Sequence, residues 1–213
     1  MNILVSCDDK YLIPQKVALR SFFETNMPGS RHVIYMLRHK LSASADEELR
    51  SLVESFGGTY FSIEVGSGAF EGADTKSYIS VETYFRLLAA EYLPADVDRV
   101  LWLDSDILVR KSLDVLYNSD FDGNWAVACS YGPRMKKLIL ENAARIGLSD
   151  PDKYFNAGVM LYNLDALRGA DLLSRQKMYL NMDRKLMFPG QDLTNNLFDG
   201  HVKIVDYRLW RTQ

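Results

Sequence analysis

The chain has 213 residues, of which 47% are hydrophobic and 25% are charged, as in a single packed globular domain. Its formal net charge is −3, and its few neighbouring basic residues do not make the clustered positive face that a nucleic-acid backbone requires. We therefore expect no nucleic-acid partner.

The chain begins directly with a strand-like run, NILVSC, without a basic region or a long apolar stretch. We therefore predict neither a signal peptide nor a transmembrane helix, and we expect the protein in the cytoplasm. Cys7 and Cys129 both lie in apolar runs, ILVSC and WAVAC. This setting predicts two buried free thiols rather than metal ligands.

The first half of the chain alternates short apolar runs with helical patterns, which is typical of an α/β domain. We predict strands at residues 3–7, 32–37 and 59–64, and a helix at residues 12–24. A second helix is expected to open on a capping box, in which Ser44 and Glu47 satisfy free backbone amides, and to end at Gly57 and Gly58.

The second half continues this alternation after a loop of small residues, GSGA, at residues 66–69. We predict a helix at residues 81–92, stopped by Pro94, and a wholly apolar strand, VLWL, at residues 100–103. Further strands are predicted at residues 125–129 and 159–162, and further helices at residues 134–146 and 172–180. Because we find no repeat, linker or low-complexity tract, we predict one domain over residues 1–213.

The segment that carries the clearest chemistry is VLWLDSDILV, where Asp104 and Asp106 follow the apolar strand. Carboxylates at positions i and i+2 of an extended chain point to the same side, at the strand end where open α/β sheets bind ligands. Two close carboxylates disfavour each other's charge unless a cation lies between them, and Mg²⁺ and Mn²⁺ prefer oxygen ligands and bridge to phosphates. The segment therefore suggests a site for a metal ion and a diphosphate.

The same segment has two other interpretations. Asp-Ser-Asp after a strand also occurs as a turn whose side chains cap backbone amides. In haloacid-dehalogenase-type phosphatases a buried strand is likewise followed by Asp-x-Asp, and the first aspartate is the nucleophile. That arrangement normally lies near the start of its domain, whereas about a hundred residues precede Asp104 here.

Four blocks of sequence, in this order, resemble the family 8 glycosyltransferases, which include bacterial lipopolysaccharide galactosyl- and glucosyltransferases and, more distantly, glycogenin. The blocks are ILVSCDDKY, ISVETYFRL with the following EYLP, VLWLDSDILV and KYFNAGVMLYNL, and a weaker fifth block is PGQDLTNNLF. The resemblance implies a GT-A fold, which is an α/β architecture with a Rossmann-like, mostly parallel central sheet flanked by helices. It also implies transfer of galactose or glucose from a UDP-sugar with retention of configuration.

The resemblance also implies roles for individual residues. Asp104 and Asp106 inherit the coordination of Mn²⁺ (or Mg²⁺) with the donor diphosphate, and Gln191 and Asp192 lie in the segment beside the anomeric carbon. The other donor-binding residues that the matching blocks imply are Asp8, Asp9, Tyr11, Arg86, Ser105, Asn156, Ala157 and Gly158. The non-functional alternatives are capping of a helix or turn by Asp8 and Asp9, a core position for Tyr11 and a surface ion pair for Arg86.

For the reaction we favour attack by the acceptor on the same face as the departing phosphate, which takes the acceptor proton. A covalent route needs a carboxylate beside the sugar, and the resemblance places an amide, Gln191, there. Gln191 would then stabilise the oxocarbenium-like state through its carbonyl oxygen.

The sequence departs from the family pattern at three places. Tyr131 and Gly132 stand where an acidic sugar-binding or acceptor-side residue is expected, and Gly190 stands where a sugar-contacting aspartate is usual. The family's His-x-x-Gly-x-x-Lys-Pro-Trp segment, which supplies a metal ligand and a phosphate-binding lysine, does not follow in this sequence. A non-catalytic domain that binds sugar nucleotides is therefore an alternative to an active transferase.

The family context suggests a glycan or lipid-linked glycan acceptor, such as lipopolysaccharide, made at the inner face of the membrane. We expect at most peripheral membrane contact, because this sequence carries no basic, aromatic tail of the kind that holds such enzymes to membranes.

Overall fold

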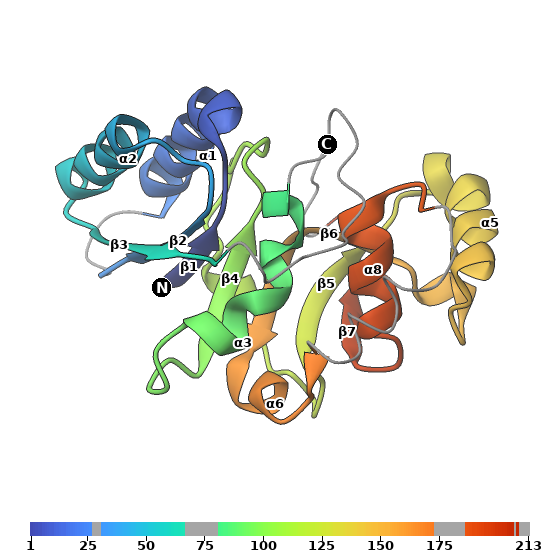
Figure 1. The fold of residues 1–213 in the computed structure, drawn as a ribbon. Helices are drawn as coiled ribbons and strands as arrows, with labels where there is room; N and C mark the ends of the chain where they lie inside the picture. The colour runs from blue at the N-terminus through green and yellow to red at the C-terminus, as the bar shows by residue number, and fades with distance from the viewer. Residues whose placement is uncertain (27–30, 67–80, 173–185, 207, 209–213) are drawn as a thin grey trace.

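The computed structural model describes residues 1–26, 31–66, 81–172, 186–206 and 208. These residues form an α/β fold around a seven-stranded sheet with the strand order β3-β2-β1-β4-β6-β5-β7 (Figure 1). The strands are β1 (Asn2–Val5), β2 (Val33–Arg38), β3 (Thr59–Glu64), β4 (Arg99–Leu103), β5 (Ala126–Ser130), β6 (Phe155–Asn163) and β7 (Val202–Val205).

The sheet has a parallel half and a mixed half. Strands β3, β2, β1 and β4 run parallel, whereas β6 runs antiparallel to both β4 and β5, and β7 is parallel to β5. The prediction of a mostly parallel sheet is therefore confirmed. The junction between β4 and β6 is also the place where strand direction changes, so loops from both halves meet beside it.

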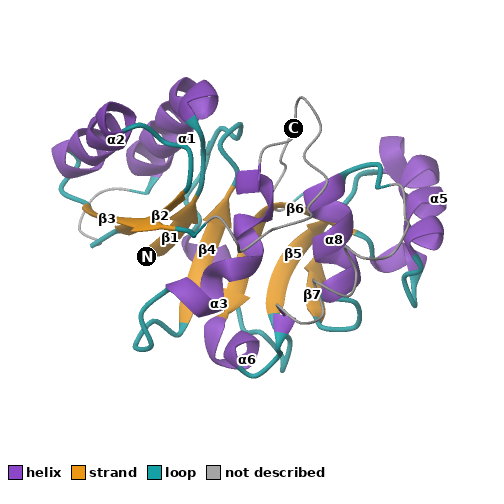
Figure 2. Ribbon diagram, viewed as in Figure 1, coloured by secondary structure: helices purple, strands orange, loops and turns teal. Residues whose placement is uncertain are grey.

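Helices cover both faces of the sheet (Figure 2). The longer helices are α1 (Leu12–Thr25), α2 (Ala43–Ser55), α5 (Lys136–Ile146) and α8 (Pro189–Leu197). The short ones are α3 (Ala89–Tyr92), α4 (Asp114–Tyr117) and α6 (Leu164–Arg168), with 3-10 turns η1 (Asp9–Tyr11), η2 (Val81–Leu88), η3 (Pro133–Met135) and η4 (Pro151–Lys153). Among the described residues, no helix has the length and apolar character needed to cross a membrane.

Alternate residues of each central strand enter different hydrophobic clusters, as the period-two geometry of a strand requires. Leu101 and Leu103 of β4 pack with α1 and α2 on one face, whereas Val100 and Trp102 pack with η2, α3, α6 and α8 on the other. Both sides of β4 are thus covered, which explains its wholly apolar sequence.

Two local predictions were wrong. The N-cap of α2 is Ser42, not Ser44: Ser42 is extended, with ψ 154°, and its Oγ accepts a hydrogen bond from the Ala45 amide at 3.3 Å. The segment 81–92 was predicted as one helix, but it is a 3-10 helix up to Leu88 and becomes α-helical only at Ala89.

Other predictions were confirmed. Strand β3 covers the predicted residues, Gly57 follows α2 with φ +75°, and Cys7 and Cys129 are buried free thiols. The predicted helix at 172–180 lies outside the described residues from residue 173 onward.

Candidate functional site

Asp104 follows β4 at the β4–β6 junction, where one contact of its side chain and one of its backbone fix its position. Oδ1 accepts a hydrogen bond from Trp102 Nε1 at 2.7 Å, and the backbone amide of Asp104 donates to the Gly158 carbonyl at 2.8 Å. Burial raises the pKa of the Asp104 carboxyl above its ordinary value, although Arg86 and Trp102 oppose this rise. The nearby charge of Asp106 raises the pKa further.

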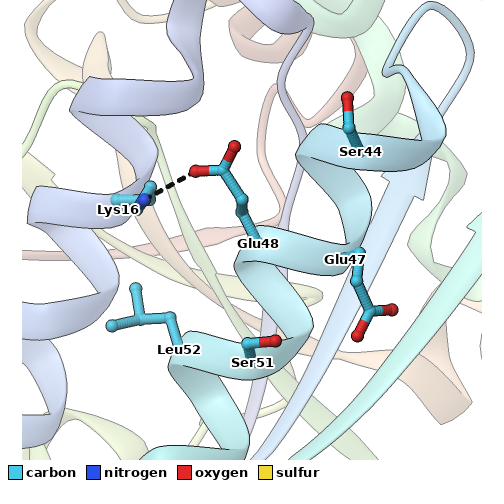
Figure 3. Close-up of a pocket in the computed structure, with 6 residues that line it drawn as sticks. All are labelled: Lys16, Ser44, Glu47, Glu48, Ser51 and Leu52. Carbon is cyan, nitrogen blue, oxygen red and sulfur yellow. Dashed lines mark hydrogen bonds and ion pairs between the residues drawn. The ribbon is translucent and has the colours of Figure 1, made fainter.

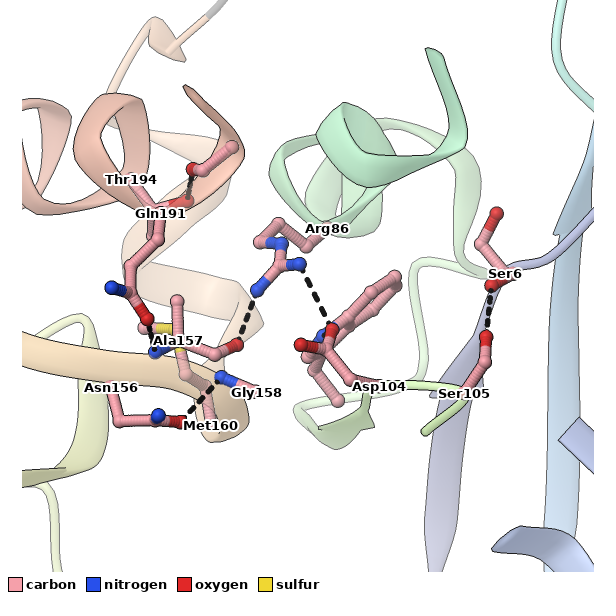
Figure 4. Close-up of polar contacts among 12 residues, drawn as sticks. Ser6, Arg86, Asp104, Ser105, Asn156, Ala157, Gly158, Met160, Gln191 and Thr194 are labelled. Carbon is pink, nitrogen blue, oxygen red and sulfur yellow. Dashed lines mark hydrogen bonds and ion pairs between the residues drawn. The ribbon is translucent and has the colours of Figure 1, made fainter. Parts of the chain in front are cut away.

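Arg86 lies on η2 with 6% of its surface exposed, so its predicted alternative as a surface ion pair is wrong. Its Nη2 lies 2.9 Å from Asp104 Oδ1, and its Nη1 donates to the Ala157 carbonyl (Figure 4). The guanidinium also lies over the Trp102 ring, 5.1 Å from its centroid. The structure therefore brings Arg86, Asp104 and Ala157 together, although they are far apart in the sequence.

Ser105 and Asp106 complete the Asp-Ser-Asp turn. The Ser105 hydroxyl lies 3.0 Å from both the Ser6 carbonyl and Gln15 Oε1, so it joins the end of β4 to the end of β1. Asp106 is exposed to solvent. The two carboxylates suit a hard divalent cation, because positive charge would offset both the burial of Asp104 and the repulsion from Asp106. Among the described residues, no group of three or more histidine, cysteine, aspartate or glutamate side chains could hold a metal.

Asn156, Ala157 and Gly158 lie in a bulge of β6. Ala128 of β5 pairs with Met160, but the next residue, Cys129, pairs with Asn156, so residues 157–159 of β6 have no partner on β5. The bulge re-aims backbone groups toward the site. The Ala157 carbonyl accepts from Arg86, and the Ala157 amide donates to Gln191 Oε1 at 3.2 Å.

Gly158 is the point of closest approach in this bulge. A Cβ at this position would lie 3.0 Å from Asp104 Oδ2 and 3.1 Å from Asn156 Oδ1. Glycine therefore lets β6 approach the carboxylate that follows β4.

Gln191 and Asp192 lie in the first turn of α8 but in different surroundings. Gln191 is half-buried and faces Ala157 (Figure 4). Asp192 has no exposed surface: Oδ2 accepts from the amides of Met187 and Phe188 at 2.8 and 3.0 Å, and Oδ1 accepts from the side chains of Asn142 and Tyr154, both at 2.6 Å. Its carboxylate thus holds the start of α8, and only Gln191 of this pair faces the β6 bulge.

Asp8, Asp9 and Tyr11 follow β1, which neighbours β4 in the sheet. Asp8 Oδ1 caps η1 by accepting from the Lys10 and Tyr11 amides at 3.0 and 3.2 Å, and Asp9 Oδ1 accepts from the Ser42 amide at 2.7 Å. The capping alternative is therefore present at both aspartates. Tyr11 is 44% exposed, so it is not a core residue.

Several residues of the site were missed at the sequence level: Trp102, Tyr131, Asn142, Arg145 and Tyr154. Trp102 looked like an ordinary strand residue, and Tyr131 was noted only as a departure from the family pattern. Arg145 contacts Asn142 and lies 3.6 Å from Asp192 Oδ2. No local spacing reveals these partners, because most of them lie 25 to 60 residues apart.

A pocket elsewhere, between α1 and α2, is lined by Lys16, Ser44, Glu47, Glu48, Ser51 and Leu52 (Figure 3). Lys16 is already paired with Glu48 at 2.8 Å. None of the residues that the sequence marked as functional lines this pocket.

Comparison with known proteins assigns the chain to a family. The model of glycosyl transferase family 8 matches residues 2–213. A lipopolysaccharide 1,2-glucosyltransferase from Escherichia coli is 26% identical over 96% of this chain and 60% of its own length. A Haemophilus influenzae relative is 28% identical over 98% of this chain and 62% of its own, so the chain spans about three fifths of these relatives.

Among solved structures, the galactosyltransferase LgtC in complex with donor and acceptor sugar analogues is similar to this chain. It is 31% identical, with a TM-score of 0.86 over 98% of this chain and 74% of its own. This likeness confirms the predicted GT-A fold. Together with the ordered blocks around Asp104, Asn156 and Gln191, the family match leads to one conclusion: the chain belongs to glycosyltransferase family 8.

Proposed function

We propose that this chain binds a UDP-sugar with a divalent cation, Mn²⁺ or Mg²⁺, and transfers the hexose, galactose or glucose, to a glycan acceptor with retention of configuration. The observation that carries the proposal is the contact between Asp104 and the buried Arg86, at the junction where the parallel and mixed halves of the sheet meet. The order of the strands reverses between β1 and β4, beside the end of β4 that Asp104 follows, and ligands of open α/β sheets bind at such a reversal. The family membership makes a haloacid-dehalogenase-type phosphatase a poor alternative.

In this proposal Asp104 and Asp106 hold the cation, which when bound stabilises negative charge on the donor diphosphate. Arg86 adds a fixed positive charge beside it, because the Ala157 carbonyl and Asp104 hold its guanidinium in one orientation. Asp8, Asp9 and Tyr11 line the nucleoside end, beside the end of β1. These groups act before any bond changes, by binding and orienting the diphosphate.

At the sugar end, Asn156, the Gly158 backbone and Gln191 would contact the hexose. In the favoured route the acceptor hydroxyl forms the new bond to the anomeric carbon while the bond to the diphosphate oxygen breaks, and the hydroxyl proton passes to that oxygen. Gln191 offers a carbonyl dipole to the positive charge that develops on the sugar. Asp192 is fully buried and its carboxylate is occupied by hydrogen bonds within the protein. We therefore propose that it stabilises the start of α8 and does not contact the sugar.

Relatives of this chain named as lipopolysaccharide glycosyltransferases suggest a glycan or lipid-linked glycan acceptor. The competing proposal is a domain that binds the donor without turning it over. It gains support from Tyr131 and Gly190, which stand where the family pattern leads us to expect acidic residues.

The proposal is tested by calorimetric titration of UDP into the chain with Mn²⁺ and then with a chelator. We expect binding with Mn²⁺ and at least tenfold weaker binding without it. Asp104→Asn and Asp106→Asn should each abolish the metal dependence while keeping the size of the side chain. Asp165→Asn, an exposed aspartate on α6, is the matched control and should bind like the parent.

Absence of UDP binding under both conditions would refute the proposed donor site. Release of UDP from UDP-galactose or UDP-glucose then separates the two proposals: turnover supports the transferase, whereas binding without turnover supports the non-catalytic domain.

A further inference from the structure

The side-chain amide of Gln191 is held by three hydrogen bonds, although it lies in the proposed sugar site. Its Oε1 accepts from the Tyr131 hydroxyl at 2.8 Å and from the Ala157 amide at 3.2 Å. Its Nε2 donates to the Tyr154 hydroxyl at 3.0 Å. These partners come from β6 and from the segments on either side of α5, so the amide is fixed from several directions.

The buried Asp192 sets the direction of this network. The Tyr154 hydroxyl donates its proton to Asp192 Oδ1, 2.6 Å away. The Tyr154 oxygen is then left to accept, and the group of Gln191 that faces it must be the NH₂. The Gln191 carbonyl consequently faces Tyr131 and Ala157.

The Tyr131 hydroxyl continues the network to β6. Its proton goes to Gln191, and its oxygen accepts from Asn156 Nδ2 at 3.3 Å. Asn156 Oδ1 in turn accepts from the Gly158 amide at 2.9 Å, which fixes the orientation of that amide as well. Burial raises the pKa of Tyr131, so its hydroxyl keeps the proton that it donates. One hydroxyl thus joins the two side chains that the proposed function places against the donor sugar.

We propose that Tyr131 is a positioning residue for the donor sugar, whose hydroxyl fixes the direction of the Gln191 amide and of Asn156 before the sugar binds. The inference rests on the proposed function. Tyr131 occupies a place where the family pattern leads us to expect an acidic residue, so this chain has a neutral hydroxyl committed to protein partners instead of a charge.

The physical effect of the hydroxyl is preorganisation. Stabilisation by a dipole requires a fixed direction, and groups that must reorient when the ligand binds lose part of the binding energy. The loss of both hydrogen bonds of this hydroxyl should weaken sugar binding about tenfold.

The test compares Tyr131→Phe with Tyr35→Phe. The control tyrosine lies on β2, stacked on Phe61, and its hydroxyl makes no hydrogen bond with the described residues. Calorimetry with Mn²⁺ measures the affinities for UDP, UDP-galactose and UDP-glucose. We expect Tyr131→Phe to bind UDP within twofold of the parent but the preferred UDP-hexose about tenfold more weakly, and Tyr35→Phe to match the parent for all three.

A double-mutant cycle identifies the route of the effect. If Tyr131 acts through Gln191, Tyr131→Phe should lose most of its effect in a Gln191→Ala background. Asn156→Ala, which removes the other partner of the hydroxyl, should lower UDP-hexose affinity and again spare UDP. A merely structural role would weaken UDP and UDP-hexose by the same factor, and that result would overturn the inference.

The remaining outcomes are distinguishable. A parent chain that fails to bind UDP refutes the proposed function and this inference with it. A parent that binds UDP, combined with a Tyr131→Phe variant that binds UDP-hexose like the parent, refutes this inference alone. A parent that binds UDP-hexose no better than UDP also refutes it, because the fixed amides then contribute nothing to recognition of the sugar.

Discussion

The two walls of the candidate site hold their polar groups by different means. On the β4 side, Asp104 is in contact with the buried Arg86 and close to Asp106, which is exposed to solvent. On the α8 side, the charge of Asp192 is buried among amides and hydroxyls, and the Arg145 guanidinium lies 3.6 Å from its Oδ2. Two aspartates that looked equally functional in the sequence therefore have opposite surroundings. A carboxylate supplied with many donors supports the fold, whereas one whose charge is disfavoured by its surroundings is suited to receive a cation.

The largest expected effect is that of Asp192→Ala. The substitution leaves the hydroxyl of Tyr154, the amide of Asn142 and two backbone amides without their acceptor in a buried place. We expect the free energy of unfolding to fall by about 3–5 kcal/mol, measured by urea denaturation. The control Asp152→Ala, at a 70% exposed side chain, should change it by less than about 0.5 kcal/mol. Equal effects of the two substitutions would contradict the supporting role of Asp192.

The next effect concerns the close approach of the two walls at Gly158. In Gly158→Ala the new Cβ would crowd Asp104 Oδ2 and Asn156 Oδ1. We expect about tenfold weaker Mn²⁺-dependent binding of UDP, because misplacing a binding group by a fraction of an ångström already costs affinity. Gly66→Ala is the matched control, since among the described residues no atom outside its chain neighbours lies within 4 Å of the added Cβ. Unchanged affinity in Gly158→Ala would mean that the donor does not use this junction.

A smaller effect is expected when Trp102 is changed to Phe. The indole N–H that holds Asp104 Oδ1 at 2.7 Å is lost, but Arg86 still contacts the same oxygen. We expect about threefold weaker binding of UDP with Mn²⁺, which corresponds to the lower end of a single hydrogen bond. Trp125→Phe, at a tryptophan that stacks on His201 in the mixed half, should leave the affinity unchanged.

The smallest expected effect is the slow chemical labelling of the two cysteines. Burial raises the pKa of both Cys7 and Cys129 to about 12, so the reactive thiolate is scarce over the whole range in which the protein is handled. Iodoacetamide at pH 8 should label neither cysteine in the native chain, and mass spectrometry should find both labelled in urea. The native labelling rate should rise as the pH increases toward 12. Rapid native labelling at pH 8 would show that one of these thiols is accessible.

The parallel half of the fold was largely predictable from the sequence, and the site only in part. Strand β3 and the start of α1 follow from local apolar runs, because each element there is made by neighbours in the chain. Asp104, Asp106 and Arg86 were found from a motif and a resemblance. The apolar pattern at residues 81–92 was interpreted as an α-helix, but Val81–Leu88 is a 3-10 helix. Because 3-10 runs longer than three or four residues are uncommon, a helical pattern of this length favours an α-helix.

The contacts on the α8 side of the site could not be predicted in the same way. Tyr131 meets Gln191 across 60 residues of sequence, and Asn142 meets Asp192 across 50. The bulge in β6 was not predicted either. The sequence predicted a strand only at 159–162, whereas β6 begins at Phe155, before the bulge.

The bulge also makes the site observable in the absence of any ligand. Most amides of β6 are bonded to a neighbouring strand, but the Ala157 amide is bonded to the side chain of Gln191. Its exchange with deuterium should therefore follow the movement of one side chain, while that of Leu161, which pairs with both β4 and β5, follows the opening of the sheet. The exchange rate of the Ala157 amide therefore reports how often the Gln191 side chain breaks this hydrogen bond. This movement has a time scale separate from the unfolding of β6.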